Sequence, residues 1–567
     1  MSPSKTLISV VLPLIYLSRI QQQRHLSYFA LAAPPPAAFS SFSQPTSSCP
    51  RSTNMRYWLA SRTRRPSSVS SCTQARYPGD IETNPLRLSI SILSKGPLAT
   101  GASDVVGSEN GIGVRRTPIL NSQRSPNRNV AMIASSRVES PTDHRGGLSG
   151  ASSVNWPLWY VLPIAPYQKR KTLMKEIVPG KVWTFDQLQG ILYVIVPIRM
   201  TVIKLENTPG GGLFVYAPVA PTGECLSMLR ALEAEHGSVK HIVLGTLGLE
   251  HKVFAGPFSQ RFSEARVWYT PGQYSYPIGL PLSWLGFGGR PTQPIPADSR
   301  DAPWAADLDH AVLGPFFSKD RSGGYGETAF FHKETKTLLV TDMVVKVEDE
   351  VPEIVAQDPS PLLFHARDNA YERVENTSEV LRKGWRRIVQ FALTFQPSSL
   401  EVVDIKTAVF QDAPQSKMPE LGWGGLFPFE WKSSTRDMKN FEAMKGGLLV
   451  APILQVLLLN RDPVPVLDWA DRVSQWPFKR VIPCHLANDI AATPQEFRQA
   501  FRFLEKTSSN ASPVGGLLSL FGGRGASGGK SAQPLDEDLQ FLRDAEKTLV
   551  DLGTLFPAEE PVDRSRR

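Results

Sequence analysis

The stretch from Val239 to Pro257, which reads VKHIVLGTLGLEHKVFAGP, constrains the fold more than any other part of the chain. It opens with a short apolar run, HIVLG, which is typical of a strand that is covered on both faces. A Glu-His pair, Glu250 and His251, follows shortly after, and we expect a helix from Val253 to Ala265. Because a second apolar run, RVWYT, comes next, the order predicts a strand-loop-helix-strand unit of an α/β protein.

The chain continues this mixed pattern on both sides of that unit. Two β-rich runs, 191–205 and 213–219, flank a glycine turn and predict a hairpin. Thr222 is a suitable N-cap, and Gly237 a suitable C-terminal stop, for the amphipathic helix between them. Further strands are predicted within 328–342 and 478–485, and further helices at 377–395, 440–460, 493–505 and 536–556.

The first 79 residues differ in composition from everything that follows. They contain nine Lys or Arg and no Asp or Glu. The rest of the chain therefore has 53 of the 62 basic residues and all 53 acidic residues, so its formal net charge is zero. A basic face for nucleic acid is therefore not indicated, and we expect no nucleic-acid partner. The apolar run 6–17 is too short to span a bilayer and suits a signal-peptide core, and the Ser- and Arg-rich continuation has the composition of a transit peptide.

This two-part leader resembles that of plastid proteins in algae with secondary plastids, which implies a chloroplast or other plastid location; a mitochondrial presequence is the alternative. Composition predicts a disordered leader at 1–79, a linker at 80–152, a folded domain at 153–507, a Gly- and Ser-rich insertion at 508–535, and a C-terminal helix and tail at 536–567. The apolar run 446–460 contains a Pro and is short, so we expect a buried helix there and no transmembrane segment in the mature protein.

Acidic and imidazole side chains stand at the carboxyl ends of three predicted strands: Glu250 with His251, then Asp342, then His485. Strand ends are where α/β folds gather their ligands. Two imidazoles and two carboxylates suit zinc, or iron or manganese when water completes a higher coordination number. The pattern predicts a divalent metal site that would serve a small-molecule substrate. The simpler interpretation of Glu250 and His251 is a helix start with an acid at its N-terminus.

The order of these parts is similar to the metallo-β-lactamase-like fold, and the resemblance implies an αββα sandwich. In that superfamily the ligand loop reads His-x-His-x-Asp-His. Here Thr246 and Gly248 stand at the first two His positions, Glu250 replaces the Asp, and His251 keeps the last His.

Two later motifs of the superfamily also find a counterpart. A strand that ends in a bridging Asp corresponds to Asp342, and a C-terminal Pro-Gly-His corresponds to Pro483-Cys484-His485. In two-metal members the first two His of the loop serve one metal, whereas the Asp-His pair and the C-terminal His serve the other. The resemblance therefore implies one metal at most, or none.

Several blocks of sequence resemble an uncharacterised group of plant and algal plastid proteins that is known as a domain of unknown function. They include GLEHKVF, TLLVTD, LLFHARD, RKGWRRI and WPFKRVIPCH. The resemblance covers about residues 155–506, and it implies a fold and a plastid location but no reaction.

Two functions remain open at this point. The first is a hydrolase or oxidoreductase of a small substrate whose single metal is held by Glu250, His251, Asp342 and His485. The alternative is a catalytically degenerate binding or assembly factor. That factor would use Trp- and Pro-rich surfaces, which include Trp156, Trp159, Trp284 and Trp423.

Two further clusters have competing interpretations. The run His365-Ala366-Arg367-Asp368 could supply another imidazole or bind an anion, or it could be a buried ion pair that closes a loop. The run RKGWRR (382–387) interleaves a Trp with four cations, as a nucleic-acid or anionic-lipid patch would. We favour the buried ion pair for the first cluster and a solvated helix face for the second.

Overall fold

The structure is a computed structural model, and it describes residues 170–564 apart from 192, 275–280, 322, 422, 433 and 507–531. The predicted leader (1–79) and linker (80–152) lie outside the described residues, as does most of the insertion (508–535). Trp156, Trp159 and the side chain of Trp423 lie outside them too.

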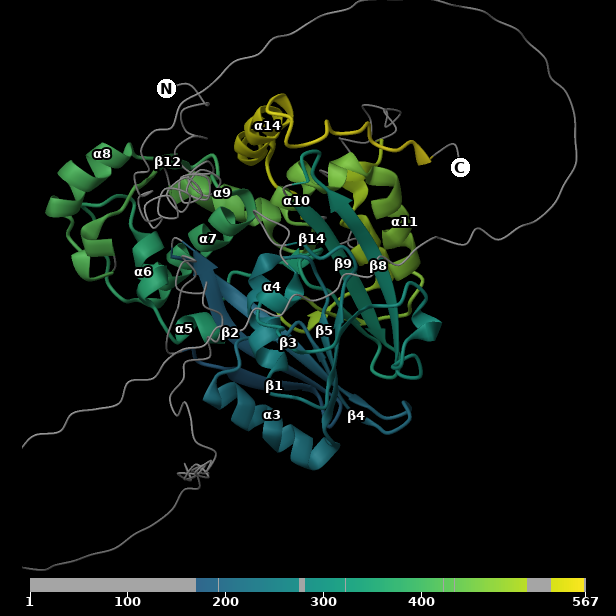
Figure 1. The fold of residues 1–567 in the computed structure, drawn as a ribbon. Coiled ribbons are helices and arrows are strands. Elements are labelled where there is room, and N and C mark those ends of the chain that lie inside the picture. The colour runs from purple at the N-terminus through teal and green to yellow at the C-terminus, as the bar shows by residue number, and fades with distance from the viewer. Residues whose placement is uncertain are drawn as a thin grey trace, which may run out of the picture. The chain divides into compact units, whose positions relative to one another are not determined.

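Seven strands form the first sheet, in the order β1-β2-β3-β4-β5-β6-β7 (Figure 1). Their bounds are β1 (Leu173–Val178), β2 (Val182–Ile191), β3 (Val194–Leu205), β4 (Gly212–Tyr216), β5 (Val239–Leu244), β6 (Arg266–Tyr269) and β7 (Thr292–Pro294). Strands β1 to β4 pair antiparallel and β4 to β7 parallel. The predicted hairpin is present as β3 and β4. The run that begins at 191 is interrupted, because Tyr193 at φ 60° lies in the turn between β2 and β3.

Five strands form the second sheet, in the order β16-β15-β10-β9-β8. Their bounds are β8 (Leu308–Phe317), β9 (Gly324–His332), β10 (Thr337–Leu339), β15 (Arg480–Ile482) and β16 (Ile490–Ala491). Strand β10 runs parallel to β15, and the other neighbours are antiparallel. Two small pairs complete the strands, β11 (Val345–Lys346) with β14 (Leu448–Leu449) and β12 (Leu400–Val402) with β13 (Phe429–Trp431).

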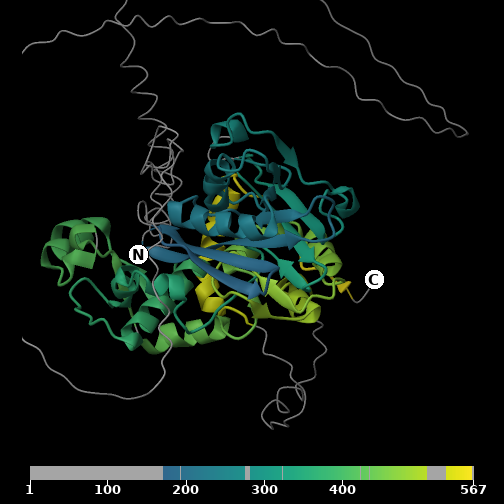
Figure 2. The same ribbon diagram turned by 90° about the horizontal axis from the view of Figure 1, so that it is seen from below.

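Apolar side chains alternate between the two faces of each sheet, as the two-residue period of a strand requires. In β4, Phe214 points into the layer between the sheets, whereas Leu213 packs against α3 (Gly223–His236) and α4 (Leu249–Ser259). In β9, Phe330 joins the same inter-sheet layer, and its neighbours join the core on the other side. Helices thus cover the outer face of each sheet, which confirms the predicted αββα sandwich (Figures 1 and 2).

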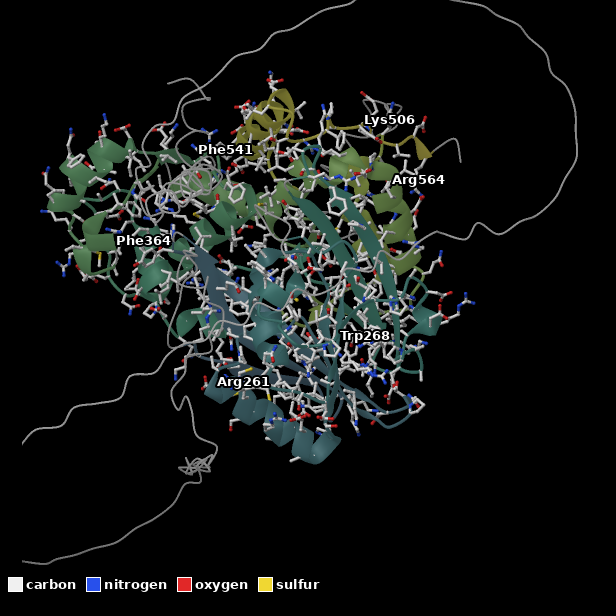
Figure 3. All side chains as sticks on the ribbon, viewed as in Figure 1. Arg261, Trp268, Phe364, Lys506, Phe541 and Arg564 are labelled. Atoms are coloured by element: carbon white, nitrogen blue, oxygen red, sulfur yellow. The ribbon has the colours of Figure 1, made fainter. Side chains whose placement is uncertain are left out.

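The layer between the sheets is rich in aromatic rings. Trp304 is fully buried at its centre and packs edge-on against Trp268, which Figure 3 labels. The indole Nε1 of Trp268 donates to His241 Nδ1 at 3.1 Å, and that of Trp304 to His310 Nδ1 at 3.4 Å. Burial lowers the pKa of His241 to about 4, so this ring is neutral near pH 7.

Several helices form one core with the second sheet and with strands β2 and β3 of the first, and Figure 2 shows most of them in green and yellow-green below the blue strands. They are α5 (Glu353–Ala356), α6 (Ser360–Ala366), α7 (Ser378–Thr394), α9 (Ser434–Met444), α10 (Pro452–Leu457), α11 (Pro463–Val473), α12 (Pro494–Gln499) and α14 (Asp536–Asp551). The helix predicted at 377–395 is confirmed as α7. Its N-cap Thr377 accepts a hydrogen bond from the amide of Val380.

Three predicted helices are shorter than expected. The helix predicted at 440–460 is wrong, because Gly446 at φ 108° ends α9, strand β14 intervenes, and α10 begins only at Pro452. The helix predicted at 493–505 ends at Gln499, and the one predicted at 536–556 ends at Asp551, ahead of Gly553 at φ 75°. None of the helices in the described part of the chain has the length and apolarity needed to cross a bilayer.

The run RKGWRR lies in α7, and its interpretation as a solvated face is wrong for three members, Gly384, Trp385 and Arg387. Arg387 is fully buried and Trp385 is 2% exposed. Arg387 pairs with Asp368 at 2.6 Å and with Asp437 at 2.8 Å. It also donates to the carbonyls of Ala366 and Arg367 at 3.0 Å each, which end α6. A buried cation at a helix C-terminus satisfies the last carbonyls and the helix dipole together.

The interpretation of the His365 to Asp368 cluster as a buried ion pair holds only in part. Asp368, whose side chain is 40% exposed, pairs with Arg387 of α7, whereas the buried Arg367 lies over the rings of Phe364 and Phe427. His365 is fully buried and lies among the rings of Phe364, which Figure 3 labels, Phe391 and Phe429. It does not join the group of side chains at Glu250 and His251.

Candidate metal centre

Glu250 and His251 lie in the first turn of α4, directly after the loop that leaves β5. The predicted helix start at Val253 is wrong by four residues, because Gly248 serves as the N-cap and the helix begins at Leu249. The Glu250 carboxylate therefore stands at the positive end of a helix, as the simpler interpretation required. His251 points inward and is fully buried.

Two glycines make room for this loop. A Cβ on Gly245 would lie 2.3 Å from the ring of Tyr216, so only glycine allows the chain to pass over that ring. A Cβ on Gly248 would lie 2.7 Å from Oε1 of Glu250, which shows that the Glu250 side chain folds back over this position. The carboxylate of Glu250 thus fills the space beside Gly248.

Asp342 follows β10, and a buried acid from the neighbouring strand positions it. Glu327 in β9 is fully buried, and its carboxylate accepts hydrogen bonds from the amides of Thr341 (2.8 Å), Asp342 (2.9 Å) and Met343 (3.0 Å). Tyr325 donates to the same carboxylate at 3.0 Å. Burial and the charge of Asp342 raise the pKa of Glu327. Sequence reasoning missed Glu327, although an acid inside the run GYGETAFFH is a signal of a buried polar role.

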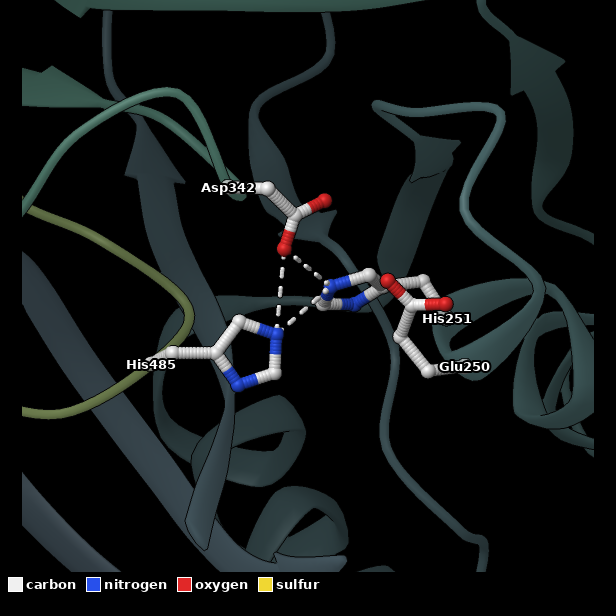
Figure 4. A group of neighbouring side chains, drawn as sticks. All are labelled: Glu250, His251, Asp342 and His485. Atoms are coloured by element: carbon white, nitrogen blue, oxygen red, sulfur yellow. Dashed lines mark hydrogen bonds and ion pairs between the residues drawn. The ribbon is translucent and has the colours of Figure 1, made fainter. Parts of the chain in front are cut away.

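His485 lies in the loop after β15, and its ring is oriented by β3. Its Nδ1 lies 2.8 Å from the carbonyl oxygen of Pro197. Because a carbonyl can only accept, Nδ1 carries the proton, and Nε2 of the neutral ring has a free lone pair. Nε2 points toward Asp342 and His251 (Figure 4).

The structure brings together all four side chains that the sequence singled out. One donor atom from each of Glu250, His251, Asp342 and His485 lies within 4.8 Å of the other three, although the residues are up to 235 positions apart (Figure 4). Asp342 Oδ1 is 3.4 Å from His251 Nε2 and 3.1 Å from His485 Nε2. The two Nε2 atoms are 3.3 Å apart.

The charges in this cluster depend strongly on one another. Burial alone would raise the pKa of Asp342, but His251 and His485 hold it well below its usual range. Burial alone would lower the pKa of His251. The pKa is nevertheless raised, because Asp342 attracts the ring by its charge and by a hydrogen bond, and Glu250 and Glu327 add smaller effects. Asp342 is therefore ionised, and it attracts positive charge to this point.

The triangle of donor atoms fits a divalent cation. Ligand atoms about 2.0–2.2 Å from a tetrahedral zinc ion are about 3.3–3.6 Å from one another. The three edges of 3.1, 3.3 and 3.4 Å lie close to that range. Two of them exceed the usual hydrogen-bond distance of about 2.7–3.2 Å for nitrogen donors.

Other features limit the site to one ion. Thr246 and Gly248 offer no imidazole, and the Thr246 hydroxyl is 3.4 Å from Asp342 Oδ2 and accepts from the amide of Gly248. In the part of the chain that the structure describes, this is the one cluster of three or more His, Cys, Asp or Glu with metal-binding spacing. His251 Nδ1 is buried and finds no hydrogen-bond partner there, a departure from the usual metal-bound imidazole.

Comparisons with known proteins found similar solved structures and one matching family model. Solved structures that resemble the chain include a metallo-β-lactamase from Pontibacter korlensis (10% identity; 59% of this chain and 99% of that chain; TM-score 0.28). Others are a metal-soaked flavodiiron core from Synechocystis sp. (9%; 59% and 60%; 0.29) and a flavoprotein from Thermotoga maritima (8%; 60% and 64%; 0.30). At this level of similarity they bear on neither the metal nor the substrate of this chain.

Among curated proteins, none matches the chain. The family model described as a domain of unknown function (DUF4336) matches residues 179–503, which is more than half of the chain and includes all four clustered side chains. The protein therefore belongs to the family of this domain of unknown function, DUF4336.

Proposed function

We propose that the protein binds one divalent metal ion through Glu250, His251, Asp342 and His485 and that it is a metal-dependent enzyme of a small substrate. The observation that carries the proposal is the triangle of Asp342 Oδ1 and the two Nε2 atoms, with edges of 3.1 to 3.4 Å. Zinc would favour hydrolysis, and iron or manganese would favour oxidation or reduction.

The four side chains would have different roles in metal and substrate binding. Two carboxylates balance the charge of a divalent ion, and two neutral imidazoles complete the set without adding charge. A bound metal would polarise a carbonyl or water. The side chains of Asp342 and His485 are 15% and 18% exposed, whereas that of His251 is closed off. A substrate would therefore approach past Glu250, Asp342 and His485, and His251 forms the inner wall.

One observation favours a second candidate function. The raised pKa of His251 would allow a doubly protonated ring, whose Nε2 proton lies between Asp342 and His485. The cluster would then be a buried ion pair, and the chain would be a catalytically degenerate binding or assembly factor. Metal content separates the two candidates.

We expect the purified full chain, equilibrated with buffered Zn²⁺, to retain about one equivalent of zinc per chain, because four donors hold the ion. The double variant His251→Ala, His485→Ala should retain less than ~0.1 equivalent of zinc, because it lacks two of these donors. Elemental analysis by mass spectrometry measures both. His236→Ala is the matched control, because His236 is a partly exposed imidazole on α3, and it should retain the ion. Equal metal content in the double variant and the unchanged protein would contradict the proposal.

We also propose that the protein acts in a plastid. The acid-free, Arg- and Ser-rich composition of residues 1–79 supports this location. Residues 1–79 fused to a fluorescent protein should direct it to the plastid of an alga with secondary plastids, and a fusion to residues 80–152 should not. Accumulation of the first fusion in mitochondria would favour the alternative presequence.

A further inference from the structure

The loop that carries His485 has an unusual anchor. Arg199 in β3 is 1% exposed, and its guanidinium lies against the backbone on both sides of His485. Nη1 donates to the carbonyl of Pro483 at 2.7 Å and to that of Ala487 at 3.2 Å. Nη2 donates to the carbonyl of Leu486 at 3.2 Å. One side chain therefore fixes three carbonyls within five residues of chain.

A carboxylate holds the guanidinium in turn. Nε of Arg199 is 2.6 Å from Asp186 Oδ1, and Nη2 donates to Asp186 Oδ2 at 3.2 Å. Asp186 and Arg199 are directly paired residues of β2 and β3. All three guanidinium nitrogens thus have a partner, which a lysine could not reproduce with its single nitrogen.

The loop needs such an anchor because its backbone is strained. Leu486, the residue after His485, has a φ of 55°, in the left-handed region that leucine disfavours. Arg199 holds the carbonyl of Leu486 itself and those of Pro483 and Ala487 on either side of it. Without them the loop is free to relax, and the ring of His485 would turn with it.

Strand β3 thus acts on His485 in two ways. The carbonyl of Pro197 accepts from His485 Nδ1, and Arg199, two residues later, holds the loop. Pro197 lies beyond the part of β3 that pairs with β4, which begins at Thr201, so its carbonyl is available to the ring.

We propose that Arg199 is a positioning residue for the metal centre, which keeps Nε2 of His485 aimed at Asp342 and His251 by holding the backbone on both sides of His485. This inference rests on the proposed metal site. It concerns a residue outside the ligand set, because Arg199 touches none of the four donor atoms.

The test compares Arg199→Lys with Arg387→Lys in the full chain. Both substitutions shorten a buried, carboxylate-paired arginine, but Arg387 lies in the helical layer. We expect Arg199→Lys to bind Co²⁺ about 10–100-fold more weakly, with an altered visible absorption of the bound ion, and Arg387→Lys to bind as the unchanged protein does. Unchanged affinity and absorption in Arg199→Lys would overturn the inference.

A second measurement keeps the two proposals apart. If the unchanged protein binds neither Co²⁺ nor Zn²⁺, the proposed function fails, and nitrogen NMR of the His485 ring in the metal-free protein then decides on Arg199. We expect a protonated Nδ1 in the unchanged protein and a mixture of tautomers in Arg199→Lys. The same single tautomer in both would overturn the inference. If Arg199→Lys does not fold, Asp186→Asn is used in its place. This substitution keeps the guanidinium of Arg199 but removes its charged partner. We expect it to weaken Co²⁺ binding and to mix the tautomers of His485 in the same direction as Arg199→Lys.

Discussion

Changing Asp342 to Asn is expected to raise the dissociation constant for Zn²⁺ by more than ~100-fold, because loss of a residue that merely supports a ligand already costs about 10–100-fold. Asp342 Oδ1 makes two of the three edges of the donor triangle. Asn keeps the shape of the side chain but removes the negative charge that draws a cation between the two imidazoles. Competition against a chromophoric chelator measures the constant.

Asp309→Asn is the control for this substitution. It makes the same change of charge in β8, where Asp309 pairs with Lys333 at 3.0 Å near the surface. Its dissociation constant for Zn²⁺ should stay within about threefold of the original, since exposed pairs have small and local effects. Equal affinities in Asp342→Asn and Asp309→Asn would show that Asp342 is not a ligand.

Changing Glu327 to Gln is expected to lower the free energy of unfolding by at least ~3 kcal/mol, because the new amide group would face backbone N–H groups that now donate to a carboxylate. Glu327 accepts three backbone amides and one hydroxyl, all in a place closed to water. For a folded part of this size, the midpoint of thermal unfolding should fall by roughly 4 °C. Urea and thermal denaturation of the metal-free protein measure these changes.

Glu401→Gln is the control for the loss of a carboxylate. Glu401 in β12 pairs with Lys432 and is 53% exposed, so the free energy of unfolding should change by less than about 0.5 kcal/mol. If Glu327→Gln were as mild as Glu401→Gln, the hydrogen bonds to Glu327 would not hold the backbone at Asp342, and the loop would be stable by other means.

Much of the sandwich could be predicted from the sequence because its strands are short, apolar and bounded by turns. HIVLG, TLLV and RVI are examples, and all of their residues except Arg480 are buried in the structure. The four clustered side chains could be identified because each follows a short apolar strand, and strand ends are where α/β folds gather their ligands. Sequence alone gave no distances between them.

What could not be predicted depends on contacts between distant parts of the chain. Nothing near Arg199 in the sequence shows that its partners lie at 483–487, and the alternation of β3 gives no sign of a buried cation. Arg387 was misjudged in the same way, because a basic run is usually solvated and here Asp437 and Asp368 bury one member of it. The helix expected at 440–460 was wrong because apolarity cannot distinguish a buried helix from a strand followed by a short helix.

The donors of the candidate metal centre belong to both sheets. Glu250 and His251 follow β5 of the seven-stranded sheet, whereas Asp342 and His485 follow β10 and β15 of the five-stranded one. The spacing of the donors is therefore a measure of how the two sheets are aligned. A substitution in the aromatic layer around Trp304 that lets one sheet shift on the other would therefore change the affinity for a metal ion, although Trp304 is not one of the four donors.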